Sequence, residues 1–191
     1  MKYLLDTADK NEINTWKNII VGVTTNPKLV KTSNANIREL ASQFEDLKFF
    51  YQIRSEDEIL AGPEKYDIVY KIPMIYPDGY NLLKKLYTLG YRICATMVYD
   101  LNQLNFAAEC GADYSIILVA KNDNQNFLEE AVEFKRKNEL KIKLIAASFR
   151  TKNDILRAIK SGVDYATIPP KIMKLVFHNL QTVEEYGTTY S

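Results

Sequence analysis

Three segments of the chain repeat one pattern, in which a helical tail is followed by a glycine and then by a short apolar run. The segments are TLGYRI (88–93), ECGADYSII (109–117) and KSGVDYATI (160–168), and their glycines are Gly90, Gly111 and Gly162. Helices commonly end on a left-handed residue, where glycine avoids the clash of a Cβ. The glycines recur at spacings that fit repeating units of about 25 residues. This pattern predicts a chain of alternating helices and strands.

Short apolar runs extend the pattern over the whole chain. Between these runs lie three segments that carry apolar residues at helical spacing, 36–44, 80–89 and 153–160. The runs themselves are apolar on both faces, as in strands buried between two layers. Strands alternating with helices indicate a parallel α/β architecture. The predicted strands are Tyr3–Asp6, Ile20–Thr24, Lys48–Gln52, Ile68–Lys71, Ile93–Val98, Tyr114–Val119, Lys143–Ser148 and Tyr165–Ile168.

An open sheet and a closed barrel can both be built from this order of elements. The first predicted strand runs into DTAD (6–9) without a glycine, so the fingerprint of dinucleotide-binding open sheets is absent. Eight units fit a (β/α)8 TIM barrel, and 191 residues fall just under its usual lower limit of about 200. We therefore expect one minimal barrel domain over residues 1–191, with a short C-terminal tail at about 179–191.

Charge and cysteine content exclude several classes of function. The chain has 25 Lys and Arg against 24 Asp and Glu, so nucleic acid is not an expected partner. No apolar run reaches the roughly 18 residues of a membrane span, and acidic residues follow the first apolar stretch at once, unlike in a signal peptide. Cys94 and Cys110 form no CxxC motif, and there is one histidine, so we expect no metal site. These features favour a cytoplasmic protein that does not bind membranes.

Polar residues close most of the predicted strands. In a TIM barrel the chemistry lies at the carboxyl ends of the strands, because the loops that begin there share one mouth. We therefore expect these side chains to converge although they are far apart in the sequence. They are Asp6, Thr24, Thr25, Asn26, Gln52, Lys71, Thr96 and Ser148, with Arg150 close behind the seventh strand.

Lys71 is the most informative of these residues. It lies inside the apolar run from Ile68 to Met74, where an ammonium group loses hydration and its pKa falls. A neutral amine can attack a carbonyl and form a Schiff base. The alternative is a lysine that extends its charge to solvent or pairs with a carboxylate.

The other strand-end residues also have two interpretations each. Asp6 can act as a general acid/base or cap the following helix, a task for which Asp9 is equally suited. Gln52 and Thr96 can hold a water molecule or be satisfied polar groups of the core. Ser148 and Arg150 can bind phosphate, or they can be a helix cap and a surface charge. We interpret His178 as structural or exposed.

Six motifs, in order along nearly the whole chain, resemble the transaldolase family, in particular its short fructose-6-phosphate aldolase branch. The motifs are LDTAD (5–9), GVTTNP (22–27), YKIPM (70–74), TMVY (96–99), AASFR (146–150) and ATIPP (166–170). The resemblance implies a (β/α)8 barrel that works without a cofactor, and a Schiff-base lysine on the fourth strand. It also assigns the site residues: Lys71 as that lysine, Asp6 as acid/base, Gln52 and Thr96 on the catalytic water, Thr24 and Asn26 on the substrate, and Ser148 and Arg150 on the acceptor's phosphate.

Three departures from the family pattern affect what we expect. The family's sixth strand carries an aromatic residue followed three positions later by Arg, and those positions are Leu118 and Lys121 here. Leu118 cannot help the catalytic water as the aldolase branch's Tyr does, whereas Lys121 keeps a positive charge without a bidentate fork. The C-terminal helix that packs on a neighbouring subunit is expected to be truncated or missing. The resemblance still implies a homo-oligomer.

The resemblance implies an aldolase that acts on sugars or sugar phosphates. Gln52 favours this reading, because transaldolases proper usually carry Glu there. The reaction would make or break a carbon–carbon bond between a dihydroxyacetone unit and an aldose or aldose phosphate. One alternative is a transaldolase, which passes the three-carbon unit between sugar phosphates. The other is a sugar-phosphate binding protein with weakened catalysis.

Overall fold

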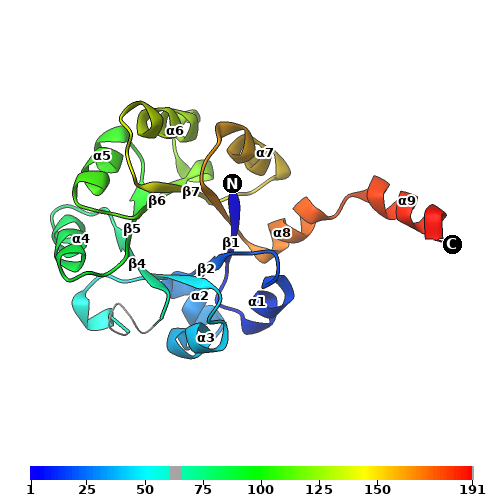
Figure 1. Cartoon of the computed structure of the whole chain (residues 1–191), viewed down its shortest axis with the longest axis horizontal. Coiled ribbons are helices and arrows are strands. Elements are labelled where there is room, and N and C mark those ends of the chain that lie inside the picture. The colour runs from blue at the N-terminus through cyan, green and yellow to red at the C-terminus, as the bar shows by residue number, and fades with distance from the viewer. Residues whose placement is uncertain (61–65, 191) are drawn as a thin grey trace.

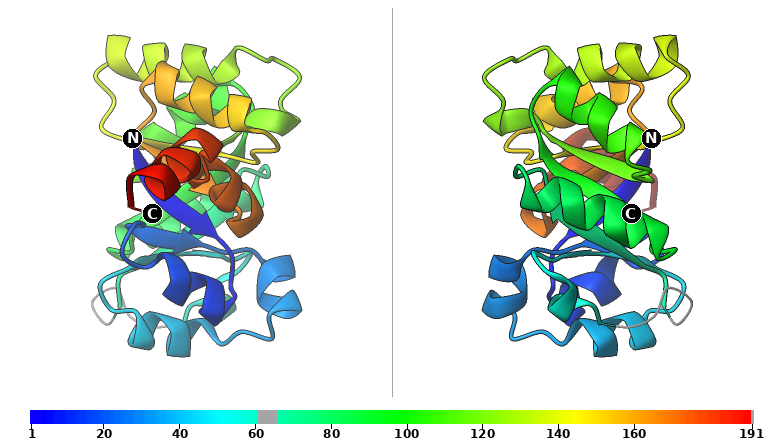
Figure 2. Two further views of the ribbon diagram at one scale, coloured as in Figure 1. Left: turned by 90° about the vertical axis from the view of Figure 1, so that its right-hand side faces the viewer. Right: turned by 90° about the vertical axis from the view of Figure 1, so that its left-hand side faces the viewer.

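The protein is a closed barrel of parallel strands surrounded by helices. A computed structural model describes residues 1–60 and 66–190. The strands pair in sequence order and β8 returns to β1, which closes the sheet. Figure 1 shows the ring with the helices outside it, and the side views in Figure 2 show helices flanking the strands. The predicted (β/α)8 TIM barrel is therefore confirmed.

Strands and helices alternate around the ring, with an extra helix after β2 and another at the C-terminus. Between β3 and β4 the described residues hold a 3-10 turn and no α-helix. The strands are β1 (Lys2–Asp6), β2 (Gly22–Thr24), β3 (Lys48–Gln52), β4 (Ile68–Pro73), β5 (Ile93–Val98), β6 (Tyr114–Leu118), β7 (Lys143–Ala147) and β8 (Tyr165–Ile168). The helices are α1 (Lys10–Trp16), α2 (Pro27–Thr32), α3 (Ile37–Gln43), α4 (Asp78–Thr88), α5 (Leu101–Glu109), α6 (Phe127–Lys137), α7 (Lys152–Ser161), α8 (Pro170–Phe177) and α9 (Leu180–Tyr190). Two short 3-10 turns, η1 (Glu56–Glu58) and η2 (Val119–Lys121), complete the set.

Alternation along each strand builds two separate apolar cores. On β4, Ile68, Tyr70 and Ile72 pack in the larger core with the helices. Val69 from the same strand belongs to the smaller core instead. That smaller core fills the barrel with Leu4, Phe50, Val69, Cys94, Tyr114, Ile116, Ile145 and Ala147. Because side chains alternate with a period of two, Lys71 follows Val69 on the interior face, toward the carboxyl end.

The predicted boundaries of β3, β5 and β8 are confirmed, and those of the other five strands differ from the structure by one or two residues. β2 begins at Gly22 instead of Ile20, and β6 ends at Leu118 because Val119 starts the turn η2. β7 stops before Ser148, whose φ of 67° is left-handed and interrupts an extended strand. The predicted left-handed glycines are confirmed, and at Gly111 an added Cβ would also lie 2.5 Å from the Tyr87 ring.

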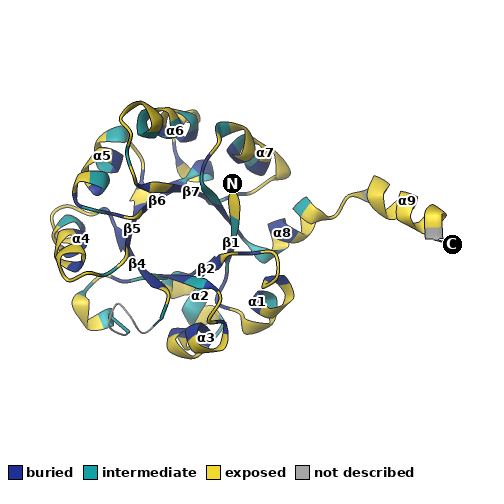
Figure 3. Cartoon of the chain, in the orientation of Figure 1, coloured by how far each residue is buried: buried dark blue, intermediate teal, exposed yellow. Residues whose placement is uncertain are grey.

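The C-terminal tail forms a helix. α9 follows α8 and extends away from the barrel, and its described side chains are exposed (Figure 3). This 11-residue helix occupies most of the predicted tail, so the C-terminal helix is present, and of the two expected alternatives only a truncated helix stays a prediction. Ser191 lies outside the described residues. Among the helices described, none combines the length and the apolar character needed to cross a bilayer.

Candidate active site

A cavity of about 390 Å³ opens at the carboxyl end of the barrel strands. It collects the predicted site residues except Thr25 and Arg150, from β1, β2, β3, β4 and β5 and from the segments that follow β2, β6 and β7. The Thr25 hydroxyl is buried instead and donates to the backbone oxygen of Phe50 at 3.2 Å. The predicted convergence of distant residues on one mouth therefore agrees with the geometry. The lining residues are Asp6, Thr24, Asn26, Pro27, Lys28, Gln52, Lys71, Thr96, Met97, Ile116, Leu118, Lys121, Ala147, Ser148 and Thr167.

Lys71 is a buried lysine with few partners. It lies in register with Gln52 on β3 and Cys94 on β5, and 5% of its surface is exposed. Its Nζ donates a hydrogen bond to the backbone oxygen of Thr25 at 2.5 Å. Burial lowers the pKa of Lys71, and the nearby carboxyl of Asp6 offsets this only in part. The arrangement favours an amine that carries a free lone pair.

Asp6 is held at the end of β1 by a pair of hydroxyl groups. Thr24 Oγ1 donates to Asp6 Oδ1 at 2.9 Å, and Thr24 and Thr167 share a second hydrogen bond of 2.5 Å. A hydroxyl has one proton to donate, so when Asp6 is ionised, Thr167 donates to Thr24 and Thr24 to Asp6. Burial raises the pKa of Asp6, against the opposing effects of Lys71 and Thr24.

Asp6 is not the cap of the first helix. Asp9 is the N-cap of α1, where its Oδ1 accepts from the backbone N–H groups of Asn11 at 2.7 Å and Glu12 at 3.3 Å. The cap task that competed for Asp6 is thus performed by its neighbour. The Asp6 carboxyl faces the cavity, where it can exchange a proton with Lys71 or with a ligand.

Gln52 and Thr96 flank Lys71 on the neighbouring strands. Thr96 is buried and Gln52 is half-buried at the last position of β3. Within the part of the chain that the structure describes, neither side chain hydrogen-bonds to another protein group. A buried hydroxyl normally has a partner, so both groups are available to a water molecule or a ligand beside the amine.

Two residues of the cavity have left-handed backbone conformations. Met97 has a φ of 61° beside an irregularity in the β5–β6 pairing, and Ser148 has a φ of 67°. Non-glycine residues pay about 1–3 kcal/mol for such conformations, which cluster at functional sites. The turn at Ser148 directs this residue to the cavity, while Phe149 behind it is buried in the larger core.

Arg150 is the predicted phosphate-binding residue that the structure does not bring to the cavity. It is exposed and absent from the lining, and its backbone N–H donates to Asp154 Oδ2 at 2.8 Å. Asp154 also forms a capping box with Thr151, which is the N-cap of α7. Neither Ser148 nor Arg150 is therefore the helix cap. The left-handed turn at Ser148 directs Ser148 to the cavity and Arg150 to the surface. This turn could not be predicted from the sequence.

Asn26 has a structural role as well as a place in the cavity. It is the N-cap of α2, and its Oδ1 accepts from the backbone N–H of Leu29 at 3.0 Å. The amide nitrogen makes no hydrogen bond to another described residue, so it can still donate to a ligand. Opposite, Leu118 lines the cavity from the end of β6, and Lys121 follows it as an exposed cation.

Sequence reasoning missed three notable residues of the cavity. Thr167 reads as an ordinary β-former in the apolar strand β8, although the period of two places it on the inner face with Tyr165, whereas Ile168 packs in the larger core. Lys28 reads as a surface residue of a short helix, and Met97 as part of a buried strand. Of the three, only Thr167 could have been identified from the sequence, because it is the last inward-facing position of the predicted strand β8.

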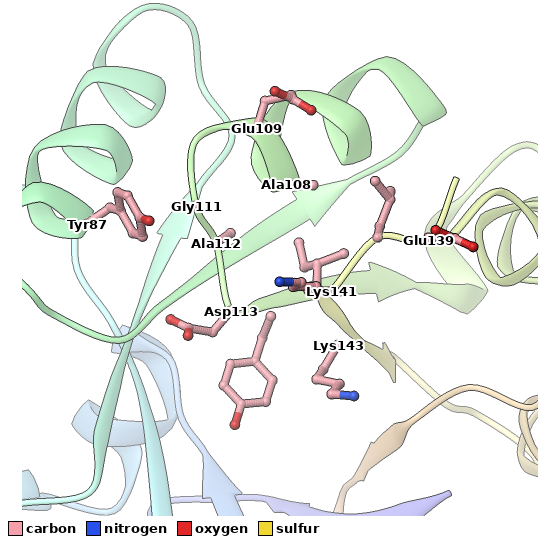
Figure 4. A pocket seen from close by; sticks show the side chains of 12 residues that line it. Tyr87, Ala108, Glu109, Gly111, Ala112, Asp113, Glu139, Lys141 and Lys143 are labelled. Carbon is pink, nitrogen blue, oxygen red and sulfur yellow. The ribbon is translucent and has the colours of Figure 1, made fainter. Parts of the chain in front are cut away.

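A second cavity of about 580 Å³ lies at the amino-terminal ends of β6 and β7 (Figure 4). Tyr87, Gly111, Asp113, Lys141 and Lys143 are among the residues that line it. It is larger, yet it holds none of the predicted residues and lies away from the mouth where TIM barrels carry out chemistry. Its Asp113 accepts a hydrogen bond from the backbone of β5, which is a role in the fold.

His178 lies outside both cavities and is exposed.

Residues 1–60 and 66–190 contain no candidate metal site. No group of three or more His, Cys, Asp or Glu side chains in these ranges could hold a metal ion. Cys94, buried beneath Lys71 in the barrel interior, has a pKa raised by burial and therefore stays a neutral thiol.

Comparison with known proteins identifies the family of this chain. The family described as Transaldolase/Fructose-6-phosphate aldolase matches residues 52–189. A probable transaldolase of Bartonella henselae is 32% identical over 94% of this chain and 91% of its own. The probable transaldolase of Carboxydothermus hydrogenoformans is 30% identical over 96% of this chain and 94% of its own. That of Moorella thermoacetica is 31% identical over 94% of this chain and 92% of its own. The chain therefore belongs to the transaldolase/fructose-6-phosphate aldolase family.

Proposed function

We propose that the protein is a lysine Schiff-base aldolase of the fructose-6-phosphate aldolase type. The observation that carries this proposal is Lys71, an amine buried at the cavity floor, with a lowered pKa and a carboxyl group nearby. An amine of this kind spends more time neutral at pH 7 than an exposed lysine does, and only the neutral form is a nucleophile.

Imine formation begins the proposed reaction. The Lys71 lone pair attacks the keto carbon of a ketose phosphate, and the carbonyl oxygen takes up a proton. The resulting carbinolamine then loses water to give a protonated imine. Asp6, whose raised pKa favours its acid form, is placed to supply these protons. Gln52 and Thr96 have free hydrogen-bonding groups on the strands that flank Lys71, so they can hold the leaving water.

Carbon–carbon cleavage follows from the positive imine. Asp6, now a carboxylate, takes the proton of the hydroxyl on the carbon beyond the bond to be broken. The bonding electrons move into the iminium, which yields an enamine on Lys71 and a free aldehyde. Protonation of the enamine carbon and hydrolysis release dihydroxyacetone. The imine accepts the electrons, so this route uses no metal or cofactor.

Ser148 and Lys121 support a phosphate on the aldehyde fragment. A hydroxyl and an ammonium at one side of the mouth suit a phosphate at the far end of the sugar. Arg150, predicted for the same role, does not contact the cavity, so the proposed phosphate site rests on the other two residues.

Transaldolase activity is the second candidate, because the relatives are named probable transaldolases. The enamine would then attack a second aldose phosphate instead of being protonated. Gln52 and the resemblance to the short aldolase branch favour the aldolase. Analysis of products from a ketose phosphate, with and without an aldose phosphate acceptor, separates the two. Free dihydroxyacetone without an acceptor identifies the aldolase, and turnover only with an acceptor identifies the transaldolase.

Borohydride trapping with intact-mass detection tests the proposed chemistry. Reduction of the imine with dihydroxyacetone should add one dihydroxyacetone unit minus its carbonyl oxygen. Lys71→Arg should abolish this gain because a guanidinium stays protonated, whereas Lys31→Arg, on the exposed face of α2, should keep it. Undiminished trapping in a folded Lys71→Arg variant would overturn the assignment. Ligand binding without any trapping in the natural protein would indicate the sugar-phosphate binding protein instead.

A further inference from the structure

Two buried threonine hydroxyls lie behind the Asp6 carboxyl, and the proposed reaction has given them no task. Thr24 ends β2 and Thr167 lies on β8, and these two strands pair with β1 on either side. Their hydroxyl oxygens are 2.5 Å apart, at the short end of the range for O–H···O bonds. Thr24 Oγ1 is 2.9 Å from Asp6 Oδ1. A continuous hydrogen-bonded chain therefore runs from Thr167 to the carboxyl.

The number of protons fixes the direction of this chain. Within residues 1–60 and 66–190, the Thr167 hydroxyl hydrogen-bonds only to Thr24, and the Thr24 hydroxyl only to Thr167 and Asp6. If Thr167 donates to Thr24 and Thr24 donates to Asp6 Oδ1, both hydroxyl protons have an acceptor. In the opposite direction, the Thr167 proton has no acceptor in the described part of the chain, and a buried donor without an acceptor is unfavourable. The chain therefore points toward Asp6.

We propose that Thr167 is a positioning residue for the general acid/base, because its hydroxyl keeps Asp6 Oδ1 an acceptor and so leaves the exchangeable proton to Oδ2. This rests on the proposed function, in which Asp6 gives and takes protons at the substrate. Asp6 lines the cavity, and its Oδ2 makes no hydrogen bond to a residue that the structure describes. A proton on Oδ2 can therefore pass to a ligand, whereas a proton on Oδ1 would be bound by Thr24.

Removing the Thr167 hydroxyl would free the acceptor site on Thr24. The protonated carboxyl could then donate from Oδ1 to the Thr24 oxygen, which stabilises the acid form and turns its proton away from the ligand. The ionised form would lose stabilisation, since the Thr24 hydroxyl donates more weakly when no second hydroxyl polarises it. Both effects have the same sign, so the loss should raise the pKa of Asp6 further above its ordinary value.

The charged groups around Asp6 do not depend on Thr167. Lys71 on β4 acts on the carboxyl through its charge, and Cys94 on β5 is a neutral thiol. Asp9 at the start of α1 accepts from that helix's own N–H groups. The two exposed cations at the rim of the cavity are Lys28 and Lys121. None of these groups hydrogen-bonds to the Thr167 hydroxyl, so an effect of Thr167 on Asp6 passes through Thr24.

Infrared difference spectra against Asp6→Asn test this inference, because they isolate the carbonyl band of the protonated Asp6 carboxyl at each pH. Thr167→Val keeps the branched shape and removes the hydroxyl. It should raise the midpoint of this titration by about one pH unit, the equivalent of about one hydrogen bond. Thr167→Ser retains a hydroxyl and should restore the natural midpoint.

Ser115→Ala is the matched control, because it also removes a buried hydroxyl from a barrel strand. Ser115 lies between Tyr114 and Ile116 on β6, and these two residues face the barrel interior. The period of two therefore turns Ser115 away from the cavity. This variant should leave the Asp6 midpoint unchanged.

Steady-state kinetics give a second readout. Thr167→Val should lower kcat for cleavage of a ketose phosphate about tenfold and leave KM unchanged, since Thr167 orients the acid/base and does not hold the substrate. Thr167→Ser should recover the natural kcat. A residue that only fills space would show no such recovery, because serine lacks the methyl group and valine keeps the volume.

The outcomes separate this inference from the proposed function. A natural midpoint in Thr167→Val, or equal shifts in the valine and serine variants, overturns the role of Thr167 and leaves the aldolase standing. A raised KM with an unchanged kcat also overturns it. The infrared midpoint does not depend on turnover, so a protein that traps no ketone overturns the aldolase while the hydrogen-bond direction is still tested. Thr167→Ala replaces the valine variant if that variant's circular dichroism spectrum differs from the natural protein's.

Discussion

Replacing Lys71 and Asp6 together should make the protein more stable while abolishing activity. The double variant Lys71→Met, Asp6→Asn keeps both side-chain volumes close to the originals and removes both ionisable groups. In the natural protein, an ammonium at Lys71 has three N–H donors and, among the described residues, one protein acceptor, the Thr25 carbonyl oxygen. Burial therefore disfavours the charged form of Lys71, and likewise that of Asp6.

The change in the free energy of unfolding can be estimated from the interactions that the double variant removes. Replacing a buried pair by neutral groups of similar volume commonly stabilises by about 1–4 kcal/mol. The Thr25 carbonyl loses its donor, which offsets about 1 kcal/mol. A net gain of about 2 kcal/mol corresponds to a rise in Tm of roughly 4–8 °C for a chain of this size. Each single variant should be less stable than the double, because it leaves one buried ionisable group without its partner.

The sign of the pH dependence gives a sharper test. The pKa of Lys71 is lowered from 10.5, so the unfolded chain binds more protons in the window below 10.5, and stability rises with pH there. The pKa of Asp6 is raised from 3.8, so the folded chain binds more protons just above 3.8, and stability falls as pH rises through that window. The advantage of the double variant should therefore be greatest near neutral pH and shrink toward both limits.

Urea unfolding at pH 5, 7 and 9, followed by circular dichroism, measures the difference directly. The midpoint concentration should rise in the double variant at pH 7, with an unchanged slope. A double variant less stable than the natural protein at all three pH values would refute the reasoning, since it would show that the charged pair stabilises the fold.

Three further outcomes test the site. Asp6→Asn should lower kcat about 10²–10⁴-fold in steady-state assays, and a loss below about threefold would leave Asp6 without a role in proton transfer. Leu118→Tyr should raise kcat, because the phenol can position water; a folded variant that traps imine normally and gains no turnover contradicts this. Lys121→Ala should raise the KM for a sugar phosphate about tenfold and leave that for the unphosphorylated sugar unchanged, whereas Arg150→Ala should alter neither. Equal effects of the last two substitutions would show that the cavity geometry misplaces the phosphate.

Much of the fold and the centre of the site could be predicted from the sequence. Lys71 is conspicuous because a charge inside an apolar run must have a reason to be there. Asp6 could be given another role because Asp9 was equally suited to cap the helix, and Asp9 is the cap in the structure. Glycines at helix ends indicated the repeat of helices and strands, since only residues without a Cβ adopt the left-handed conformation freely.

The rest of the site depends on backbone directions that residue types do not encode. Ser148 and Arg150 are two positions apart, which in a continuing strand would place them on the same face. The left-handed turn at Ser148 ends that alternation and sends Arg150 to the surface. Lys28 could not be identified because a lysine in the first turn of a short helix is usually solvated, and only the closed ring brings it over the cavity.

The hydroxyl chain from Thr167 through Thr24 to Asp6 joins the last strand of the barrel to the first two. A nascent chain that has emerged only as far as β7 contains Lys71, Asp6 and Thr24, yet it lacks Thr167, the hydroxyl that directs the Thr24 proton toward the ionised Asp6. Such a chain cannot close its ring, and the amine stays open to water, where it remains an ordinary protonated lysine. Under the proposed function, the reactivity of Lys71 is therefore withheld until synthesis has passed residue 167, and a truncated product should be inert toward the carbonyl compounds around it.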